Sequence, residues 1–457
     1  MRYRVRMLVQ DDAVLENVVL EVTDGHISAI DDGPHTHDLG DVVALPGHVN
    51  AHSHAFQRGI RGRTEYVDVG RSADDFWSWR ARMYGLAERL TPEQLYTISK
   101  MAFLEMALSG ITSVGEFHYL HHQRDGTPYD DPNELAHQVI KAATDVGLRI
   151  TLLRVAYERA GARRPLESHQ RRFSDGDVDL YLSRVETLSR AWRDVDTVDV
   201  GYAPHSVRAV SAPWLESIGL DAERHGRPLH IHACEQRREL EECVAEYGHG
   251  PVQVLAQTGI LTPKTTLVHA THLDAAALSL IDAMRPTICA CPTTERNLGD
   301  GFLPTSELIQ RDIPIALGSD GQSEINLFQD VRLLEYHERL RVERRNVLAE
   351  YAPVSLGQRQ TADVLWPMLN RHGARALGTP VGQLIVGAPA DFTTVDLSAP
   401  SLAGTDAIHI RSDSVFSVNP RSIYGVFVAG KPIVEGGHHR HQQEIISAFR
   451  TLMTALN

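Results

Sequence analysis

The hydrophobic positions in the middle of the chain form short runs rich in β-branched residues, separated by longer stretches with apolar residues at helical spacing. Such alternation predicts eight β-then-α units that close into a parallel (β/α)8 barrel with right-handed crossovers. A doubly wound open sheet is the alternative, but no Gly-rich phosphate loop supports it. The eight predicted strands are residues 42–45, 111–114, 150–155, 198–202, 229–231, 265–268, 287–290 and 313–317.

The interval after the first of these runs shows helical spacing most clearly. Residues 91–94 read Thr-Pro-Glu-Gln, a capping box with proline in the first turn. A helix is therefore expected to begin there and to bury one apolar face. The positions of that face are Leu95, Ile98, Met101, Leu104 and Leu108.

Both ends of the chain have a different texture, with strand-like runs separated by tight turns. They lie at residues 3–9, 18–22 and 26–30, and again at 390–395, 423–428 and 432–434. Two β-rich ends around a barrel predict one small β-domain built from both termini. The expected organisation is a β-domain of residues 1–45 plus 385–440, a barrel of 46–384, and an amphipathic C-terminal helix of 441–457.

Two polar tracts are expected at the surface. Residues 436–441 read Gly-Gly-His-His-Arg-His, which resembles a metal-binding sequence but is interpreted as a solvated turn. Residues 335–345 carry a run of charges that predicts the exposed face of the helix after the eighth strand.

Composition narrows the classes of function. The net charge of −14 over 457 residues argues against a broad nucleic-acid surface, which needs clustered Lys and Arg. No apolar stretch approaches the roughly 18 residues of a membrane span, and no apolar signal-peptide region follows the basic N-terminal residues. Four cysteines without a CxxC motif predict reduced thiols and a cytoplasmic location.

Polar side chains gather at the ends of the predicted strands, where barrel enzymes carry their catalytic groups. His52 and His54 are two residues apart and can share a face. With a third imidazole from the fifth strand and a carboxylate from the eighth, they form a donor set suited to Zn²⁺, with a position left for water. Each residue alone has an ordinary structural explanation, but their joint placement predicts a metal site. The strand-end residues are His52, His54, His205, His230, His232, His269 and Asp320.

Glu235 lies three residues beyond His232, where a carboxylate can reach both a metal-activated water and a leaving group. This placement suits a general acid/base. The alternative is a surface glutamate that begins the following helix and interacts with its dipole.

Six motifs resemble the amidohydrolase superfamily and, within it, the formimidoylglutamate deiminases of bacterial histidine degradation. The superfamily-wide elements are the HxH, HxxE, H and SD patterns, whereas HAFQR, FWSWR and EFHYLHH are narrower and carry the subfamily resemblance. The likeness extends over nearly the whole chain. The motifs are HSHAFQRG (52–59), FWSWR (76–80), EFHYLHH (116–122), HIHACEQ (230–236), LVHATH (267–272) and LGSD (317–320).

The resemblance implies one zinc ion per chain, because the bridging lysine of two-metal members is replaced by His205 and its neighbours at the end of the fourth strand. It implies hydrolysis of N-formimino-L-glutamate to N-formyl-L-glutamate and ammonia. The partner is then a small dicarboxylate, and a homodimer is left open. The implied zinc ligands are His52, His54, His232 and Asp320; the implied catalytic residues are Glu235, His269 and Asp320; the implied substrate contacts are Gln57, Arg80, Tyr119, His205 and Arg208.

Two rival functions follow from the same residues. A superfamily deaminase of nucleobases or triazines would use an aromatic or amide-lined pocket, whereas Arg80 and Arg208 are suited to bidentate carboxylate binding. A non-catalytic scaffold of the same fold should lack ligands, and none is missing here. The chain departs from the subfamily at Gly321 and Gln322, where Ser-His is usual, so this loop bears on substrate choice.

Overall fold

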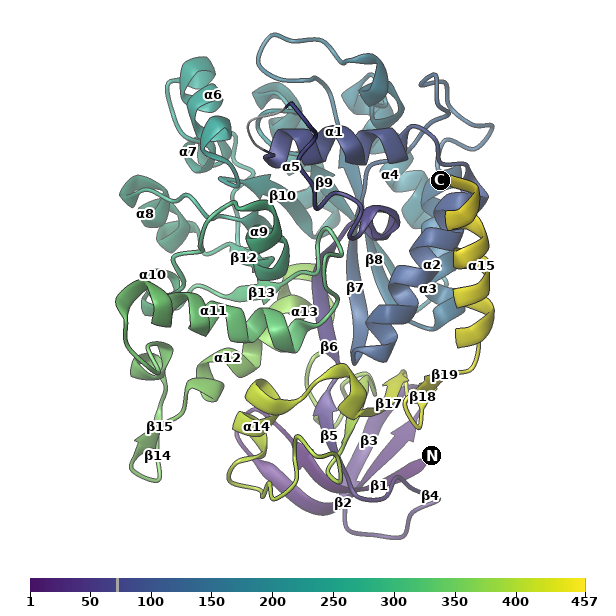
Figure 1. Ribbon diagram of the computed structural model, residues 1–457, viewed down its shortest axis with the longest axis vertical. Helices are drawn as coiled ribbons and strands as arrows, with labels where there is room; N and C mark the ends of the chain where they lie inside the picture. The colour runs from purple at the N-terminus through teal and green to yellow at the C-terminus, as the bar shows by residue number, and fades with distance from the viewer. Residues whose placement is uncertain (71–73, 457) are drawn as a thin grey trace.

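The computed structural model describes residues 1–70 and 74–456, and within them eight parallel strands close into a barrel in the order β10-β11-β12-β13-β6-β7-β8-β9. The predicted barrel is therefore confirmed, and it occupies the upper part of Figure 1. Its strands are β6 (His48–Ser53), β7 (Ile111–His118), β8 (Arg149–Ala156), β9 (Val198–Pro204), β10 (Leu229–Ala233), β11 (Thr265–His269), β12 (Thr287–Ala290) and β13 (Ile315–Leu317).

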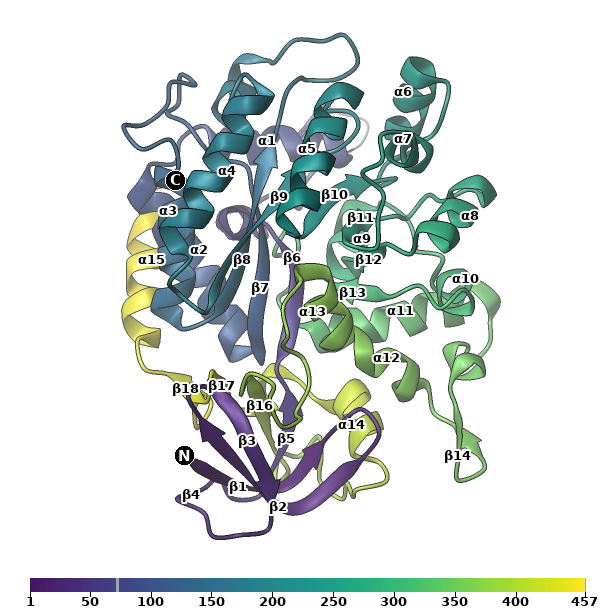
Figure 2. The same cartoon turned by 180° about the vertical axis from the view of Figure 1, so that it is seen from behind.

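Helices connect consecutive strands and lie around the outside of the barrel, as the two opposite views in Figures 1 and 2 show. They are α1 (Phe76–Ala87), α2 (Pro92–Leu108), α3 (Glu134–Val146), α4 (Val178–Trp192), α5 (Ala212–His225), α6 (Arg237–Tyr247), α7 (Pro251–Gln257), α8 (Ala275–Met284), α9 (Pro292–Leu298), α10 (Thr305–Gln310), α11 (Leu327–Val342), α12 (Thr361–Leu369) and α13 (Arg371–Leu377). A short hairpin of β14 (Val354–Ser355) and β15 (Gln358–Arg359) follows α11.

The capping box of α2 forms as predicted. The Thr91 side chain accepts the N–H of Gln94 at 3.3 Å, and the Gln94 side chain accepts the N–H of Thr91 at 3.1 Å. Leu95, Ile98 and Leu104 on the predicted face are buried.

The prediction for the first barrel strand was wrong. Residues 42–45 belong to β5 (Val42–Pro46), which pairs in parallel with β1 (Arg2–Val9) and antiparallel with β16 (Phe392–Asp396), both outside the barrel. The chain passes directly from β5 into β6, and at Gly47 an added Cβ would lie 2.2 Å from the Thr112 hydroxyl. Because two strands of different sheets follow each other with almost no loop, the hydrophobic pattern alone does not show which one closes the barrel.

The described ends of the chain form one nine-stranded sheet below the barrel, as predicted (Figure 1). The N-terminal and C-terminal halves meet where β5 pairs with β16, with Ala44 opposite Thr394. Stacked rings of Phe392 and Phe427, with centroids 4.2 Å apart, fill its core. The remaining strands are β2 (Val14–Thr23), β3 (His26–Asp31), β4 (His37–Asp38), β17 (Ile423–Val428), β18 (Lys431–Glu435) and β19 (His438–His439), and helix α14 (Ile410–Ser417) lies between β16 and β17.

The histidine-rich tract is solvated as predicted except at His439. Its central residues form edge strand β19, and His439 is buried with Nε2 3.0 Å from the carbonyl oxygen of Val146. Side chains alternate across a strand, so pairing with β18 turns His439 inward. The chain then ends in α15 (Gln442–Leu456), which runs beside α2 (Figure 1).

The charge run on α11 is likewise not wholly exposed. Glu335 and Glu338 are buried. Glu335 accepts the backbone N–H groups of Val347 and Leu348 at 3.0 and 2.9 Å, and Glu338 accepts the Ser306 hydroxyl at 2.8 Å. These carboxylates satisfy buried donors in the segments before and after α11, which a one-dimensional charge pattern does not reveal.

Two predictions drawn from composition can be compared with the structure. All four cysteines are free and buried. Within the described ranges, no helix has both the length and the apolar character needed to cross a bilayer.

Candidate active site

Four donor side chains converge at the mouth of the barrel. His52 Nε2 lies 3.2 Å from His232 Nε2 and 3.4 Å from Asp320 Oδ1, and His54 Nε2 lies 3.3 Å from the same oxygen. Neighbouring ligand atoms of a tetrahedral zinc site with bonds of about 2.0–2.1 Å are separated by about 3.3 Å. The spacing of the predicted ligands therefore fits a small tetrahedral ion such as zinc.

The protonation of the three imidazoles also suits metal binding. Burial lowers the pKa of His52 to about 3 and lowers those of His54 and His232 as well, so all three are neutral. Nδ1 of His54 lies 2.9 Å from the carbonyl oxygen of Phe117, and Nδ1 of His232 lies 3.0 Å from that of His205. A carbonyl only accepts, so each Nδ1 carries the proton and each Nε2 keeps a free electron pair for a metal.

The barrel backbone brings Asp320 to the histidines. The N–H of Asp320 donates to the carbonyl oxygen of His52, and the N–H of His54 donates to that of Asp320, both at 3.0 Å. Asp320 and His269 both adopt left-handed backbone conformations, with φ of 43° and 74°. Non-glycine residues held in this region cost about 1–3 kcal/mol, and such residues cluster at functional sites.

The two histidines of the fifth strand make different contacts. His232 faces the donor cluster, whereas His230 places Nε2 2.8 Å from the carbonyl oxygen of Ala376 on α13. Residues two apart share a strand face, so the two imidazoles lie on the same side of β10, and His230 differs in lying one step nearer the start of the strand.

Glu235 and His269 lie next to the donor cluster. Nε2 of His269 is 3.6 Å from Glu235 Oε1 and 3.7 Å from Asp320 Oδ2. Burial raises the pKa of the Glu235 carboxyl. Burial would lower the pKa of His269, but the carboxylates of Glu235, Glu295 and Asp320 together raise it. Glu235 precedes α6 and is buried, so it is not a surface residue opening that helix.

The predicted substrate contacts surround the same cavity, which has a volume of about 50 Å³. The Gln57 amide donates to the Tyr119 hydroxyl at 3.1 Å, while its own buried carbonyl oxygen has no partner. Five side chains of α1 form one wall. The lining residues are His54, Gln57, Phe76, Trp79, Arg80, Met83, Tyr84, Tyr119, Tyr157, His205, Arg208, His232, Glu235, His269, Leu298 and Asp320.

Within the described residues, the two arginines of the cavity make no ion pair with a carboxylate. Arg208 is 7% exposed, its Nε has no hydrogen-bond partner, and its guanidinium lies 5.5 Å from the centre of the Trp77 ring. Arg80 donates to the hydroxyls of Tyr84 and Tyr157 at 2.6 and 3.2 Å. Among the described residues, no carboxylate lies within ion-pair distance of either guanidinium. A buried cation without an anionic partner is costly unless a ligand supplies the charge.

Two residues support the site through contacts that the sequence did not indicate. Glu116 is buried at the end of β7, where it accepts the Ser53 hydroxyl at 2.5 Å and the N–H of Ala55 at 2.7 Å, on either side of His54. Gln322 is also buried and donates to Ser53 at 2.9 Å. The EFHYLHH motif contains Glu116, but its partners lie more than 60 residues away in the sequence.

The loop that departs from the subfamily has a structural explanation. Gln322 donates to Ser53 instead of lining the cavity, and an added Cβ at Gly321 would lie 3.2 Å from the Gln57 amide oxygen. The glycine therefore leaves room for a side chain that does line the cavity.

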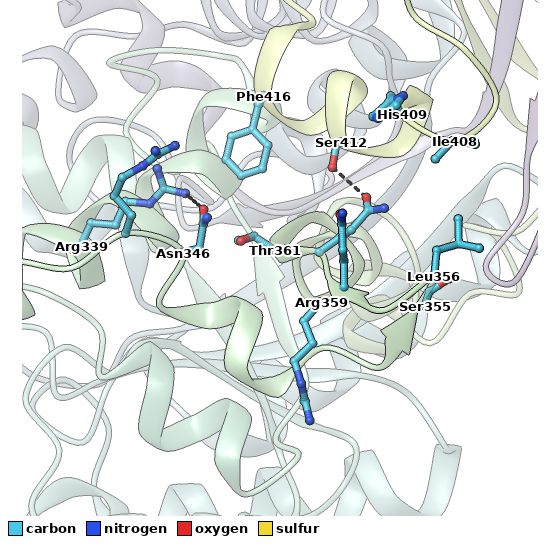
Figure 3. Close-up of a pocket in the computed structure, with 13 residues that line it drawn as sticks. Arg339, Asn346, Ser355, Leu356, Arg359, Thr361, Ile408, His409, Ser412 and Phe416 are labelled. Atoms are coloured by element: carbon cyan, nitrogen blue, oxygen red, sulfur yellow. Dashed lines mark hydrogen bonds between the residues drawn. The ribbon is translucent and has the colours of Figure 1, made fainter.

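A larger cavity of about 520 Å³ lies among α11, α12, α14 and the β14–β15 hairpin, and shares no lining residue with the smaller one (Figure 3). Its polar groups largely satisfy one another. Arg339 pairs with Glu335 at 2.6 Å and donates to Asn346 at 2.8 Å, and Ser412 donates to Gln360 at 3.0 Å. The convergent unpaired donors lie in the smaller cavity, which is the candidate active site.

The profile of the amidohydrolase family matches residues 43–433, which span the barrel and, in the nine-stranded sheet, strands β16 and β17 with most of β5. The chain belongs to the amidohydrolase family. As an amidohydrolase it is a hydrolase acting on C–N bonds, and its relatives are deaminases.

Similar amidohydrolases cover almost the full chain. Formimidoylglutamate deiminase from Pseudomonas aeruginosa is 36% identical over 412 residues, which are 90% of this chain and 88% of the relative. A 5-methylthioadenosine/S-adenosylhomocysteine deaminase from Caldanaerobacter subterraneus subsp. tengcongensis is 27% identical, covering 86% of this chain and 82% of its own. The crystal structure of an amidohydrolase from Brucella melitensis matches with a TM-score of 0.91 at 33% identity, covering 100% and 99% of the two chains.

Proposed function

We propose that this amidohydrolase is a zinc-dependent formimidoylglutamate deiminase that hydrolyses N-formimino-L-glutamate to N-formyl-L-glutamate and ammonia. The observation that carries the proposal is the buried guanidinium of Arg208, which has no acidic partner and faces the candidate active site together with Arg80. A substrate with two carboxylates supplies the missing anions. The 36% identity to the Pseudomonas aeruginosa deiminase supports the same substrate.

One zinc ion per chain is proposed, held by His52, His54, His232 and Asp320. The neutral imidazoles, the carboxylate and the spacing of the donor atoms support this set. Zinc, when bound, lowers the pKa of a water molecule toward about 7 and so makes hydroxide available at neutral pH.

The residues around the donor cluster are proposed to move protons. Asp320 Oδ2 and His269 Nε2 are 3.7 Å apart and are placed to orient a water molecule and accept its proton. Glu235, whose Oε1 lies 3.6 Å from the same Nε2 of His269, transfers a proton to the departing nitrogen. Its raised pKa suits a group that first accepts and then donates a proton near neutral pH.

The remaining cavity residues are proposed to bind the substrate. Arg80 and Arg208 bind its carboxylates, and the unpartnered carbonyl oxygen of Gln57 is available to a formimino N–H. Tyr119 and His205 complete the wall of the cavity. A neutral nucleobase or triazine would leave both guanidiniums without an anion, and the complete donor set argues against a non-catalytic scaffold.

The test is ammonia release by the zinc-loaded protein from formiminoglutamate, formiminoaspartate, guanine and cytosine, each over a range of concentrations. We expect the highest kcat/KM for formiminoglutamate and no turnover of the two nucleobases. A higher kcat/KM for either nucleobase would refute the proposed substrate class.

A further inference from the structure

A carboxylate stands behind the strand-six histidine, on the side away from the donor cluster. Glu295, on α9, is 2% exposed, and its Oε1 lies 3.3 Å from Nδ1 of His269. The other ring nitrogen of His269 faces Glu235 and Asp320. His269 therefore bridges a buried acid and the candidate reaction centre.

Glu295 is itself held in place. The oxygen that faces His269 also accepts the N–H of Cys291 at 2.8 Å. The carbonyl of Glu295 accepts the N–H of Asp300 at 2.9 Å, and Asp330 on α11 accepts the N–H of Thr293 at 3.0 Å, which ties α9 to its neighbours. One hydrogen bond therefore holds the carboxylate itself, and the other two hold the helix that carries it.

We propose that Glu295 is the positioning residue of His269. Its carboxylate accepts the Nδ1 proton and so directs Nε2 toward the reacting atoms. The hydrogen bond made by one ring nitrogen sets the tautomer and the orientation of the other. The inference rests on the proposed function only in that His269 takes part in the reaction.

A second metal ion is the competing explanation, because ligand atoms of His269, Cys291 and Glu295 all lie within 4.8 Å of one another. The geometry favours the hydrogen bond, since Glu295 Oε1 already accepts the N–H of Cys291 and lies at hydrogen-bond distance from the ring. The thiol of Cys291 is fully buried among apolar neighbours, including Cys289 and Ala316.

The test begins with two variants of the zinc-loaded enzyme. Glu295→Gln keeps the shape and an acceptor oxygen but loses the charge, whereas Glu295→Leu removes the acceptor. We expect kcat to fall about 10-fold and about 100-fold, respectively, with KM within about twofold, because an interaction made only in the transition state lowers kcat alone. Glu295 does not line the substrate cavity.

Asp330→Asn is the matched control. Asp330 is a buried carboxylate that accepts a backbone N–H of the same helix but makes no hydrogen bond or ion pair with His269. The Asp330→Asn variant should keep kcat near the wild-type value. An equal loss in this variant would show that kcat responds to disturbance of α9 in general and would overturn the inference.

A double-mutant cycle isolates the action through His269. In a His269→Asn background, Glu295→Gln should cause no further loss of kcat, because its effect passes through the removed ring. Multiplicative losses would contradict the positioning role. Elemental analysis tests the competing metal explanation. Wild type and Glu295→Gln should both hold one zinc ion. Two ions in wild type and one in the variant would establish the metal explanation instead.

A readout without substrate separates this inference from the proposed function. In zinc-loaded protein labelled with ¹⁵N-histidine, the NMR signal of His269 is identified by its absence in His269→Asn. This signal should show a protonated Nδ1 in wild type. The protonation of Nδ1 should be lost in Glu295→Leu. If wild type does not hydrolyse formiminoglutamate but shows this signal, the substrate proposal fails and the inference stands. An unchanged signal in Glu295→Leu refutes the inference whatever the substrate.

Discussion

Arg80 donates a hydrogen bond to the hydroxyl of Tyr157 at 3.2 Å, in a cavity where no described carboxylate is within reach of the guanidinium. Tyr84 accepts a second hydrogen bond at 2.6 Å. Neutral phenols orient the guanidinium without neutralising it, so its charge stays available to a ligand. The same reasoning applies to Arg208, whose Nε has no partner.

The first prediction concerns these arginines. Removing one member of a buried charge pair costs about 2–5 kcal/mol, or roughly 30- to several-thousand-fold in kcat/KM. Arg80→Met and Arg208→Met should each lower kcat/KM for formiminoglutamate within this range without changing the zinc content. Arg208→Lys should recover only part of the loss, because an ammonium does not reproduce the bidentate geometry.

Arg159→Met is a suitable control for charge removal, since Arg159 is already neutralised by Glu246 and lies outside the cavity. It should retain normal kcat/KM. If Arg80→Met and Arg208→Met both behave like this control, the cavity does not recognise carboxylates through these residues, and the substrate proposal must be withdrawn.

The second prediction concerns Glu235. Glu235→Gln should keep the donor cluster and its metal, because Glu235 is not among the four clustered ligands. It should lower kcat by roughly 10²–10⁴-fold, the range for a positioned acid/base. Steady-state ammonia release and elemental analysis measure the two effects, and near-normal kcat would show that Glu235 transfers no proton.

The strand-end residues could be predicted from the sequence because of a property of the fold. Carboxyl ends of parallel barrel strands meet at one mouth, so His54, His232 and Asp320 come together although they are distant along the chain. The sequence did not identify Glu295 and Glu116, since each acts through a partner placed by tertiary packing. A buried glutamate on a short helix and one at a strand end have no pattern of their own.

The third prediction concerns metal removal. Four ligands from three separated segments should hold about one equivalent of zinc, and a strong chelator should abolish activity and lower Tm, because the ion binds only the folded state. Readdition of zinc should restore both. Full activity and an unchanged Tm in metal-free protein would exclude the proposed zinc chemistry.

The fourth prediction concerns Glu116, which holds the segment around His54. Glu116→Ala leaves the buried N–H of Ala55 and the Ser53 hydroxyl without their acceptor. Unsatisfied buried donors cost about 1–3 kcal/mol each, so the loss of both bonds should lower the free energy of unfolding by about 2–6 kcal/mol. We also expect faster zinc loss to a chelator. Glu116→Gln, which keeps an acceptor oxygen, should lie between wild type and alanine in both measurements.

The last prediction concerns pH and Asp330, which is not one of the four clustered ligands. Burial raises the pKa of its carboxyl from 3.8 to about 8. The folded state therefore binds this proton more tightly than the unfolded chain, and the stability so contributed is fully present below pH 4 and lost as pH rises through about 8. Over that window the loss of stability is up to about 1.4 kcal/mol per pH unit.

The side chain in Asp330→Asn does not ionise, so this variant should not lose stability in this way. The difference in Tm between Asp330→Asn and wild type should therefore grow from pH 5 to pH 8 and level off above pH 8. Thermal unfolding at these pH values, on zinc-loaded protein, measures this difference directly. Parallel curves for the two proteins would show that Asp330 is ionised in the folded state throughout, with its charge compensated by Thr293 and the surrounding backbone.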